Sequence, residues 1–315
     1  MKSFLGVDVG SVSVKMALLD SNRTLRGSVY LETAGSPINA IKDALSKLEQ
    51  AIEKDNLSIN GIGITGSGRH VAVALLGADI VKNEVTAQTI AALNRQPDVS
   101  TIIEIGGQDS KIISIKDGVP LWHNLNTLCA AGTGSFLNSQ AHRLDIPIES
   151  FGDYALRSDK NLSISAKCTV FAESDMIHKA ALGHKKEDII YGLCRGLVRN
   201  FISNVSKNRV LEPPTLFTGG TAANKGVVKA FEEELKHKII VPEEHKIMGS
   251  IGMALLLLRN QPENTAFKGF GIAKEDITTE TQSCGDCSNN CEITKVFIGN
   301  RLSGYLNSRC GKFSA

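Results

Sequence analysis

Residues 101–120 read TIIEIGGQDSKIISIKDGVP, and this stretch decides the fold. An apolar run ends near the acidic residue Glu104, a glycine turn follows at Gly106 and Gly107, and a second apolar run begins after Asp109. Two apolar runs separated by a short glycine turn are typical of antiparallel strands. The stretch therefore predicts a β-hairpin with a carboxylate at the mouth of its turn.

The same pattern occurs near the N-terminus, in FLGVDVGSVSVKMALLD (residues 4–20). An acidic residue ends the first apolar run, and glycine, two serines and a lysine follow. Backbone N–H groups, hydroxyl groups and an ammonium group directed at one point suit a phosphate, and the carboxylate suits a hydrated Mg²⁺. An ordinary hairpin is the alternative, because D-x-G-S is not specific by itself. The residues assigned to this site are Asp8, Gly10, Ser11, Ser13 and Lys15.

A third glycine-rich element lies in PTLFTGGTAANKGVVKAF (residues 214–231). An apolar strand precedes it and a helical pattern follows, so the backbone at Gly219 and Gly220 can approach a ligand closely. Asn224 is expected at the same end of the ligand. Two hairpin units about a hundred residues apart, followed by this loop, predict two duplicated α/β lobes with phosphates bound between them.

Composition limits the class of protein. The chain has 315 residues, 35 basic and 33 acidic, with a net charge of +2. So balanced a charge argues against a nucleic-acid surface or a polybasic membrane anchor. The N-terminus lacks the layout of a signal peptide, and the longest apolar run, 251–258, is too short to span a bilayer. We therefore expect a cytoplasmic protein with no nucleic-acid or membrane partner.

The seven cysteines form two groups. Without an export signal they favour metal or catalytic roles over disulfides. Cys194 lies on the apolar face of an expected helix and is predicted to be core. The spacing C-x2-C-x3-C-x18-C near the C-terminus fits either a tetrahedral Zn²⁺ site or an iron–sulfur cluster, with a disordered reduced tail as the third alternative. The cysteines of this second group are Cys284, Cys287, Cys291 and Cys310.

Five motifs, in order along the chain, resemble the BadF/BadG family of ATPases. The resemblance extends from about Ser3 to Arg259. It implies the two-lobed fold of actin, Hsp70 and sugar kinases, with ribonuclease-H-like lobes. The best-known members are ATP-dependent activators of 2-hydroxyacyl-CoA dehydratases, and a related branch serves benzoyl-CoA reductase. The motifs are EIGGQDSK (104–111), CAAGTGSF (129–136), KCTVFAESD (167–175), TGGTAANKGVVKAF (218–231) and PEEHKIMGSIGMAL (242–255).

The resemblance also implies a four-iron four-sulfur cluster. In the family two cysteines per subunit, at the positions of Cys129 and Cys168, hold one cluster between two subunits. Four thiolates per cluster and two per chain require a homodimer. Both cysteines precede expected helices, whose N-terminal dipoles favour negative charge. The implied partners are an acceptor dehydratase or reductase and, as donor, reduced ferredoxin or flavodoxin, under anaerobic conditions; an inert core cysteine is the alternative for each residue alone.

ATP and Mg²⁺ acquire specific roles through the same resemblance. Glu104 stands where actin-like ATPases commonly carry an aspartate, and either Glu104 or Gln108 would orient the attacking water. Turn hydrogen bonding is the alternative for Gln108 and Asp109. Hydrolysis would change the angle between the lobes and drive the transfer of a low-potential electron to the acceptor. The implied catalytic residues are Asp8, Glu104 and Gln108, and Gly132 and Gly134 join the residues already assigned to cofactor binding.

Two other functions stay open at this point. A kinase of an amino sugar or another small alcohol has the same fold, and a nucleotide-gated scaffold needs no chemistry at all. Compact activators end near residue 260, so the cysteine-rich segment resembles longer fused members of the family. We expect a first ATPase lobe at 1–95, a second lobe with the cluster cysteines at 96–242, a helix returning to the first lobe at 243–260, a linker at 261–283 and a metal-binding segment at 284–315.

Overall fold

The computed structural model describes residues 2–53, 57–126, 129–165 and 168–313. The chain forms two compact units, Met1–Ala91 with Gly249–Ala315, and Ala92–Met248. The chain leaves the first unit within helix α3 (Glu84–Arg95) and returns to it in helix α9 (Met248–Asn260). Each unit has its own sheet and its own hydrophobic core.

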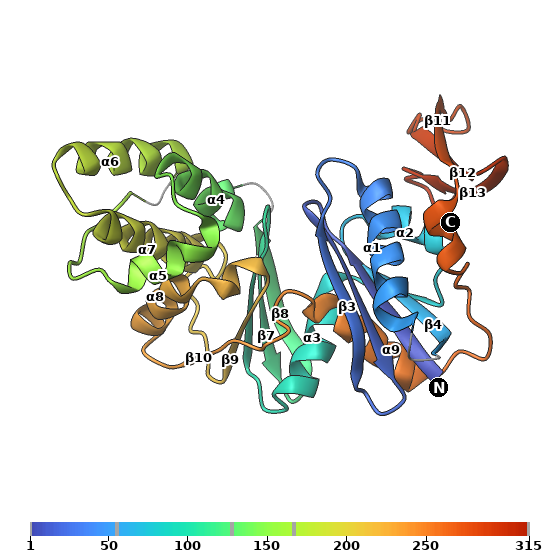
Figure 1. Cartoon of the computed structure of the whole chain (residues 1–315), viewed down its shortest axis with the longest axis horizontal. Helices are drawn as coiled ribbons and strands as arrows, with labels where there is room; N and C mark the ends of the chain where they lie inside the picture. Colours follow the sequence, from blue (N-terminus) through green and yellow to red (C-terminus); the bar gives the residue numbers. More distant parts are fainter. Residues whose placement is uncertain (1, 54–56, 127–128, 166–167, 314–315) are drawn as a thin grey trace. The chain divides into compact units, whose positions relative to one another are not determined.

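The first unit contains a five-stranded mixed sheet in the order β3-β2-β1-β4-β5 (Figure 1). β1 pairs antiparallel with β2 across the predicted turn and parallel with β4 on its other side. This register places Asp8 opposite Lys15 on β2 and beside Thr65 on β4. The strands are β1 (Lys2–Val9), β2 (Ser13–Asp20), β3 (Leu25–Glu32), β4 (Ser58–Thr65) and β5 (Ile80–Val81).

The two faces of this sheet pack differently because side chains alternate along β1. Leu5, Val7 and Val9 join the core with buried residues of helix α1 (Pro37–Ile52). Gly6 belongs to the opposite face of the sheet, which lies against α9. A Cβ added at Gly6 would be 1.8 Å from the Ser250 carbonyl oxygen. Only glycine lets a helix backbone lie this close to a strand. Within the described ranges, every helix is too short or too polar to cross a bilayer.

The second unit repeats the connectivity of the first. Its strands follow the order β8-β7-β6-β9-β10, which matches β3-β2-β1-β4-β5 strand for strand. β6 pairs antiparallel with β7 and parallel with β9, as β1 does with β2 and β4. The predicted duplication of an α/β lobe is therefore confirmed. The strands are β6 (Thr101–Ile105), β7 (Ser110–Lys116), β8 (Val119–Asn126), β9 (Thr215–Thr218) and β10 (Ile239–Ile240).

Helix α7 (Lys186–Asn204) forms the centre of the second core. Phe201 on this helix meets Phe231 edge-on with ring centroids 5.5 Å apart, and Phe217 on β9 meets Phe231 at 5.2 Å. Cys194 is fully buried in the same core, as predicted, and burial raises the pKa of its thiol to about 12. The other helices of this unit are α4 (Gly134–Arg143), α5 (Ile148–Leu156), α6 (Thr169–Ala181) and α8 (Lys225–Leu235).

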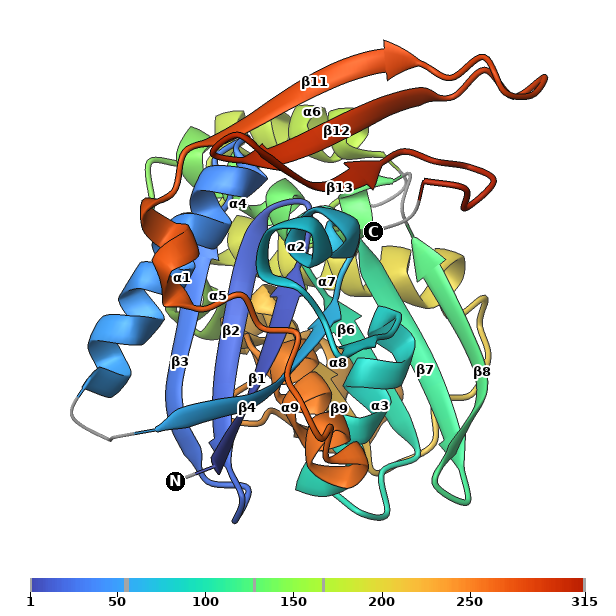
Figure 2. The same cartoon turned by 90° about the vertical axis from the view of Figure 1, so that its right-hand side faces the viewer.

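Residues 261–313, here called the C-terminal extension, belong to the first unit. Its strands β11 (Ile277–Ser283), β12 (Glu292–Ile298) and β13 (Arg301–Leu306) form a three-stranded antiparallel sheet (Figure 2). The range predicted as a linker, 261–283, contains a 3₁₀ helix, η4 (Phe270–Lys274), and strand β11. The sequence pattern did not predict these two elements, because the segment is polar and its apolar side chains pack against α1 and α2, which are distant in the sequence.

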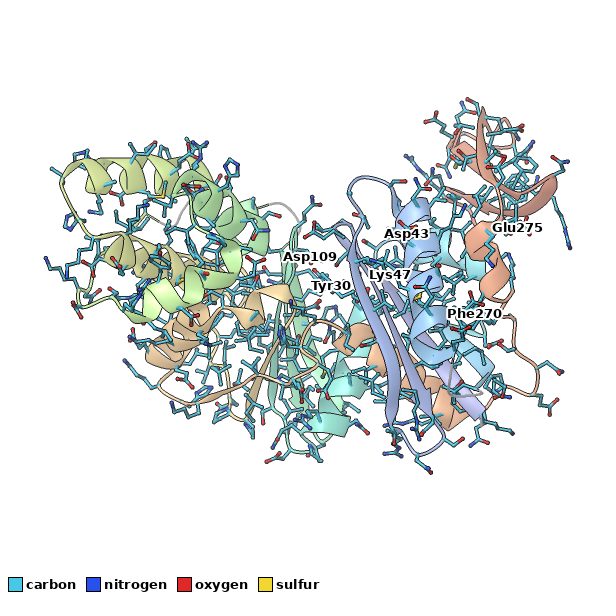
Figure 3. All side chains as sticks on the ribbon, viewed as in Figure 1. Tyr30, Asp43, Lys47, Asp109, Phe270 and Glu275 are labelled. Atoms are coloured by element: carbon cyan, nitrogen blue, oxygen red, sulfur yellow. The ribbon has the colours of Figure 1, made fainter. Side chains whose placement is uncertain are left out.

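Several contacts hold the extension to the body of the first unit. Ile272 and Val296 are buried in the core of that unit. Lys268 Nζ and Ser303 Oγ both donate to the Ala74 carbonyl oxygen near the end of helix α2 (Arg69–Leu76). Figure 3 labels Asp43 and Lys47 on α1 and Phe270 and Glu275 on the segment beside it. The extension is therefore an integral part of the first unit.

Asp79 is the polar residue on which this attachment depends. Its carboxylate accepts hydrogen bonds from Ala266 N at 2.6 Å and Thr265 Oγ1 at 3.0 Å, and from Ile62 N at 2.8 Å. We expect Asp79→Ala to lower the free energy of unfolding by about 2–3 kcal/mol, because two backbone N–H groups, one of them on the buried residue Ile62, lose a charged acceptor. Trypsin should then cleave after Lys268 far faster than in the parent. Glu49→Ala, which removes an exposed carboxylate from α1, is the control; equal cleavage rates in both variants would contradict the prediction.

Candidate functional site

Asp8 is the buried acid of the first unit. The residue is 6% exposed, and its Oδ2 lies 3.3 Å from Lys15 Nζ. Two glycines from elsewhere in the unit close around the carboxylate: an added Cβ would lie 2.6 Å from Oδ2 at Gly249 and 2.7 Å from Oδ1 at Gly66. Gly249 is in the first turn of α9, where the helix dipole favours negative charge.

Polar groups of the first hairpin surround the same point. Gly10 N donates to the Ser13 carbonyl oxygen at 2.9 Å and closes the turn, while Ser11 is exposed. Thr65 is fully buried, and its Oγ1 has no hydrogen-bond partner among the described residues. A carboxylate, hydroxyl groups and an ammonium group fit a phosphate with a hydrated Mg²⁺. Sequence reasoning missed Gly66, Gly249 and Thr65, because only the fold brings them to Asp8.

The second hairpin repeats this arrangement in the second unit. Glu104 lies opposite Lys111, as Asp8 lies opposite Lys15, and the Nζ–Oε2 distance is 3.4 Å. Lys111 also lies 2.7 Å from Asp109 Oδ2 and is 3% exposed. Gly106 N donates to the Asp109 carbonyl oxygen at 3.0 Å, the counterpart of the Gly10 bond. Sequence reasoning missed Lys111, although the spacing from acid to lysine is the same in both hairpins.

The residues of this second turn differ in their surroundings. Gln108 is exposed, and Asp109, labelled in Figure 3, is half-buried beside Lys111. Gly106 and Gly107 use their carbonyl oxygens to accept hydrogen bonds from Gly134 N at 2.8 Å and Ser135 N at 2.9 Å. The turn is therefore bonded to the start of α4. A nucleotide site shared by the two hairpins stays a prediction.

His245 holds the third glycine loop from two sides. Gly219 N donates to the His245 carbonyl oxygen at 2.8 Å, and His245 Nδ1 lies 2.8 Å from the Gly219 carbonyl oxygen, which makes Nδ1 the donor. Gly219 has φ 88°, and an added Cβ would lie 2.4 Å from the Ile105 carbonyl oxygen at the end of β6. Gly220 is exposed at the start of a 3₁₀ turn. His245 precedes α9, which begins at Met248, whereas the returning helix was predicted to begin at residue 243.

Asn224 has a structural role that the sequence analysis did not assign. It is the N-cap of α8, and its Oδ1 accepts hydrogen bonds from Gly226 N at 3.0 Å and Val227 N at 3.2 Å. Its Nδ2 is buried without a hydrogen-bond partner among the described residues. Capping satisfies N–H groups that the helix cannot. The Asn224 side chain is therefore committed to the helix start, and its contact with adenosine stays a prediction.

Cys129 and Cys168 are both free, half-buried thiols of the second unit. Cys168 is the N-cap of α6, as predicted, and its carbonyl oxygen accepts from Ala172 N at 2.9 Å. Cys129 instead precedes a 3₁₀ turn at Ala130–Gly132, and α4 begins only at Gly134. We expected Cys129 directly before a helix, but the 3₁₀ turn separates it from the start of α4. Gly132 is buried in that turn.

The four C-terminal cysteines lie at one end of the extension. Cys284 and Cys291 are buried and lie one residue beyond the paired ends of β11 and β12, where Cys284 N donates to the Cys291 carbonyl oxygen at 2.8 Å. Cys287 and Cys310 are exposed. Over the residues that the structure describes, no three His, Cys, Asp or Glu side chains gather closely enough to hold a metal ion.

Comparison with known proteins decides the family. The model of the BadF/BadG/BcrA/BcrD ATPase family matches residues 5–257. The chain belongs to this family. The match ends just before the extension, and it includes both hairpins, both body cysteines and the Gly219 loop.

Individual relatives of this BadF/BadG-family chain are similar over the same range. The (R)-2-hydroxyglutaryl-CoA dehydratase activating ATPase of Acidaminococcus fermentans is 32% identical over 254 residues, which cover 80% of this chain and 95% of that protein. An uncharacterized protein of Methanocaldococcus jannaschii is 30% identical over 80% of this chain, which spans only 61% of that longer protein. The solved activator of the 2-hydroxyisocaproyl-CoA dehydratase from Clostridium difficile, with bound ADPNP, has a TM-score of 0.75 and 29% identity over 82% of this chain and 95% of that one.

The pH dependence of stability tests the environment of His245. Burial lowers the pKa of its imidazole below the ordinary 6.5, against the opposing effect of the hydrogen bond to Gly219. The unfolded chain therefore binds a proton on His245 more tightly than the folded chain does. The contribution of His245 to the stability of the fold is fully present above pH 6.5 and is lost as the pH falls. We expect the urea midpoint to fall less between about pH 7.5 and about pH 5.5 in His245→Gln than in the parent. His70→Gln, at an exposed position, should keep the parental slope; a parental slope in His245→Gln contradicts the prediction.

Proposed function

We propose that this protein is an ATP-dependent electron-transfer activator that uses ATP hydrolysis to deliver a low-potential electron to a dehydratase or reductase. One observation carries the proposal. The second unit, which contains the turn at Gly106 and Gly107 (here called the second phosphate turn), also has two free, half-buried thiols, Cys129 and Cys168, beside helical N-termini. The similarity to a dehydratase-activating ATPase over 95% of that protein's length supports it. An ADPNP-bound structural relative supports the nucleotide part.

In this proposal the two hairpins bind ATP with Mg²⁺. Asp8, held between Lys15 and the start of α9, fits the coordination sphere of the metal, and the Gly10 turn donates to phosphate oxygens. Glu104 orients the attacking water, with Gln108 as the second residue able to reach it. The ammonium group of Lys111 lies within ion-pair distance of both Glu104 and Asp109, so it holds the two carboxylates at the same turn. Gly219, Gly220 and Asn224 approach the adenosine.

Cys129 and Cys168 fit one half of the donor set of a four-iron four-sulfur cluster. Such a cluster takes four thiolates, so the proposal requires a second copy of this chain. When bound, the cluster supplies one-electron chemistry at low potential. The chain's own contribution is to orient two thiolates and to place helix N-termini, which stabilise negative charge, beside them.

The outer face of α6 supports a dimer next to Cys168. Val170, Phe171 and Ile177 on this helix are 65%, 63% and 54% exposed, and Leu182 just after it is 63% exposed. Apolar side chains grouped on one helix are typical of surfaces covered by another protein. We propose that the second copy covers this face.

The remaining partners follow from the same chemistry. The acceptor is a 2-hydroxyacyl-CoA dehydratase or a related reductase, and the donor is reduced ferredoxin or flavodoxin, in the anaerobic cytoplasm. We also propose that the C-terminal cysteines hold Zn²⁺ or a second iron–sulfur cluster, because their spacing supplies four thiolates and a backbone hydrogen bond brings Cys284 and Cys291 together at the ends of β11 and β12. A kinase is less well supported, since a dehydratase activator matches along nearly its whole length.

Glu104→Gln tests the role of the second hairpin. An amide cannot accept the proton or hold the charge that orients the water, so we expect ATP turnover to fall by at least about 100-fold. ADPNP affinity should stay within about threefold of the parent, because Lys111 keeps Asp109 as a partner. Asp117→Asn, in the exposed turn between β7 and β8, is the matched control. Parental turnover in Glu104→Gln would remove Glu104 from the mechanism.

Phe171→Glu tests the dimer and the cluster together. A carboxylate on the apolar face of α6 should convert an anaerobically purified dimer into a monomer and remove the body iron, about four atoms per dimer. Val210→Glu, which changes an even more exposed apolar residue of the same unit, should leave both unchanged. Iron and zinc are counted in Cys168→Ser and in Cys287→Ser, which separates the body site from the extension. A dimer with parental iron in Phe171→Glu contradicts the assignment of this face.

A further inference from the structure

Residues 129–135 connect Cys129 to the turn at Gly106 and Gly107, and hydrogen bonds hold this segment at both ends. At one end, Gly134 N and Ser135 N donate to the carbonyl oxygens of Gly106 and Gly107 at 2.8 and 2.9 Å. At the other end, the side chain of Asn126 binds the backbone of Cys129. Thr127 and Leu128 lie outside the described residues.

Asn126 binds Cys129 through two bonds of opposite direction. Its Nδ2 donates to the Cys129 carbonyl oxygen at 2.8 Å, and its Oδ1 accepts from Cys129 N at 3.0 Å. Only a side-chain amide supplies a donor and an acceptor at this spacing. The backbone on both sides of the thiol is therefore fixed by a single residue at the end of β8.

The turn between these two attachments is tightly packed. An added Cβ at Gly132 would lie 3.0 Å from Asn200 Oδ1, 3.2 Å from Asn126 Nδ2 and 3.8 Å from Ser110 Oγ. Thr133 is fully buried, and its Oγ1 donates to the Ala130 carbonyl oxygen at 2.8 Å. Close-packed segments shift as a unit because they have no free volume in which to deform. A displacement of Gly106 and Gly107 is therefore passed on to Cys129.

We propose that Asn126 is a positioning residue that couples Cys129 to the phosphate turn, so that nucleotide binding changes the accessibility of the thiol. The inference rests on the proposed function for the nucleotide at Gly106 and Gly107, and it goes beyond that function by naming the link. The hydrogen bond that Ser135 N donates to the Gly107 carbonyl oxygen keeps the link rigid at its other end. Coupling then lies within one subunit, before any partner binds.

Alkylation of Cys129 in the full-length chain measures this coupling without the cluster. The chain is treated with an iron chelator and pulsed with iodoacetamide, with and without Mg²⁺ and ADPNP, and each cysteine is quantified by peptide mass spectrometry. We expect ADPNP to change the rate at Cys129 by at least about threefold, the effect of about one net hydrogen bond. Exposed Cys287 reports the activity of the reagent, and buried Cys194 reports unfolding.

Asn126→Asp is the decisive variant, because it keeps the acceptor and loses the donor. The ADPNP effect on Cys129 should disappear, while ADPNP affinity, measured by calorimetry, stays within about threefold of the parent. Asn124→Asp is the matched control: Asn124 is on the same strand and donates from Nδ2 to the Val205 carbonyl oxygen at 2.8 Å, away from the cysteine. It should keep the parental response. Reactivity of the buried Cys194 in Asn126→Asp would mean that this variant unfolds. In that case the uncharged variant Asn126→Ser is measured instead, and the same results are expected from it.

The possible outcomes separate the two levels of the argument. A persistent ADPNP effect in Asn126→Asp overturns the role of Asn126. Tight ADPNP binding to the parent with no change at Cys129 overturns the coupling but leaves the nucleotide site intact. Absence of ADPNP binding to the parent overturns the proposed function itself, and the coupling with it.

Discussion

A buried carboxylate opposite a lysine, at the mouth of a glycine turn, is the constraint on which each unit depends. A charge at 6% exposure is costly unless a partner compensates it, and Lys15 compensates Asp8 across one strand pair. The surrounding backbone must then come close without side chains, which explains the glycines at positions 66 and 249. The strand order brings β4 and α9 to this point, so the sheet topology serves the polar site.

The second unit applies the same constraint with a longer acid. Glu104 has one methylene more than Asp8, and its lysine is shared with Asp109 at the turn. The second turn is also bonded to the start of α4, a contact made possible by Gly134, whose added Cβ would lie 3.0 Å from the Gly106 carbonyl oxygen. In the first unit the acid lies between Lys15 and the start of α9, whereas in the second unit the turn is bonded to the segment that follows Cys129. Duplicated units have thus taken on different tasks.

The C-terminal extension binds one end of α2, and the first hairpin binds the other end. Lys268 and Ser303 bind the carbonyl oxygen of Ala74, and Gly68 N at the other end donates to the Val9 carbonyl oxygen at 2.8 Å, next to Asp8. The helix therefore stands between the extension and the first hairpin. The family match ends at residue 257, so this attachment distinguishes the chain from its compact relatives.

The sequence alone determined the local features. Both hairpins, the strand-to-helix loop at Gly219, the helix after Cys168 and the buried position of Cys194 follow from apolar periodicity, glycine turns and capping, which act over a few residues. Only the tertiary structure decided the contacts between distant segments: Gly249 against Asp8, His245 on Gly219 and Asp79 on Ala266. The polar range 261–283 gave no periodic signal, because its order comes from a core that it shares with α1 and α2. Sequence patterns report what each segment can form, and long-range packing selects which segments meet.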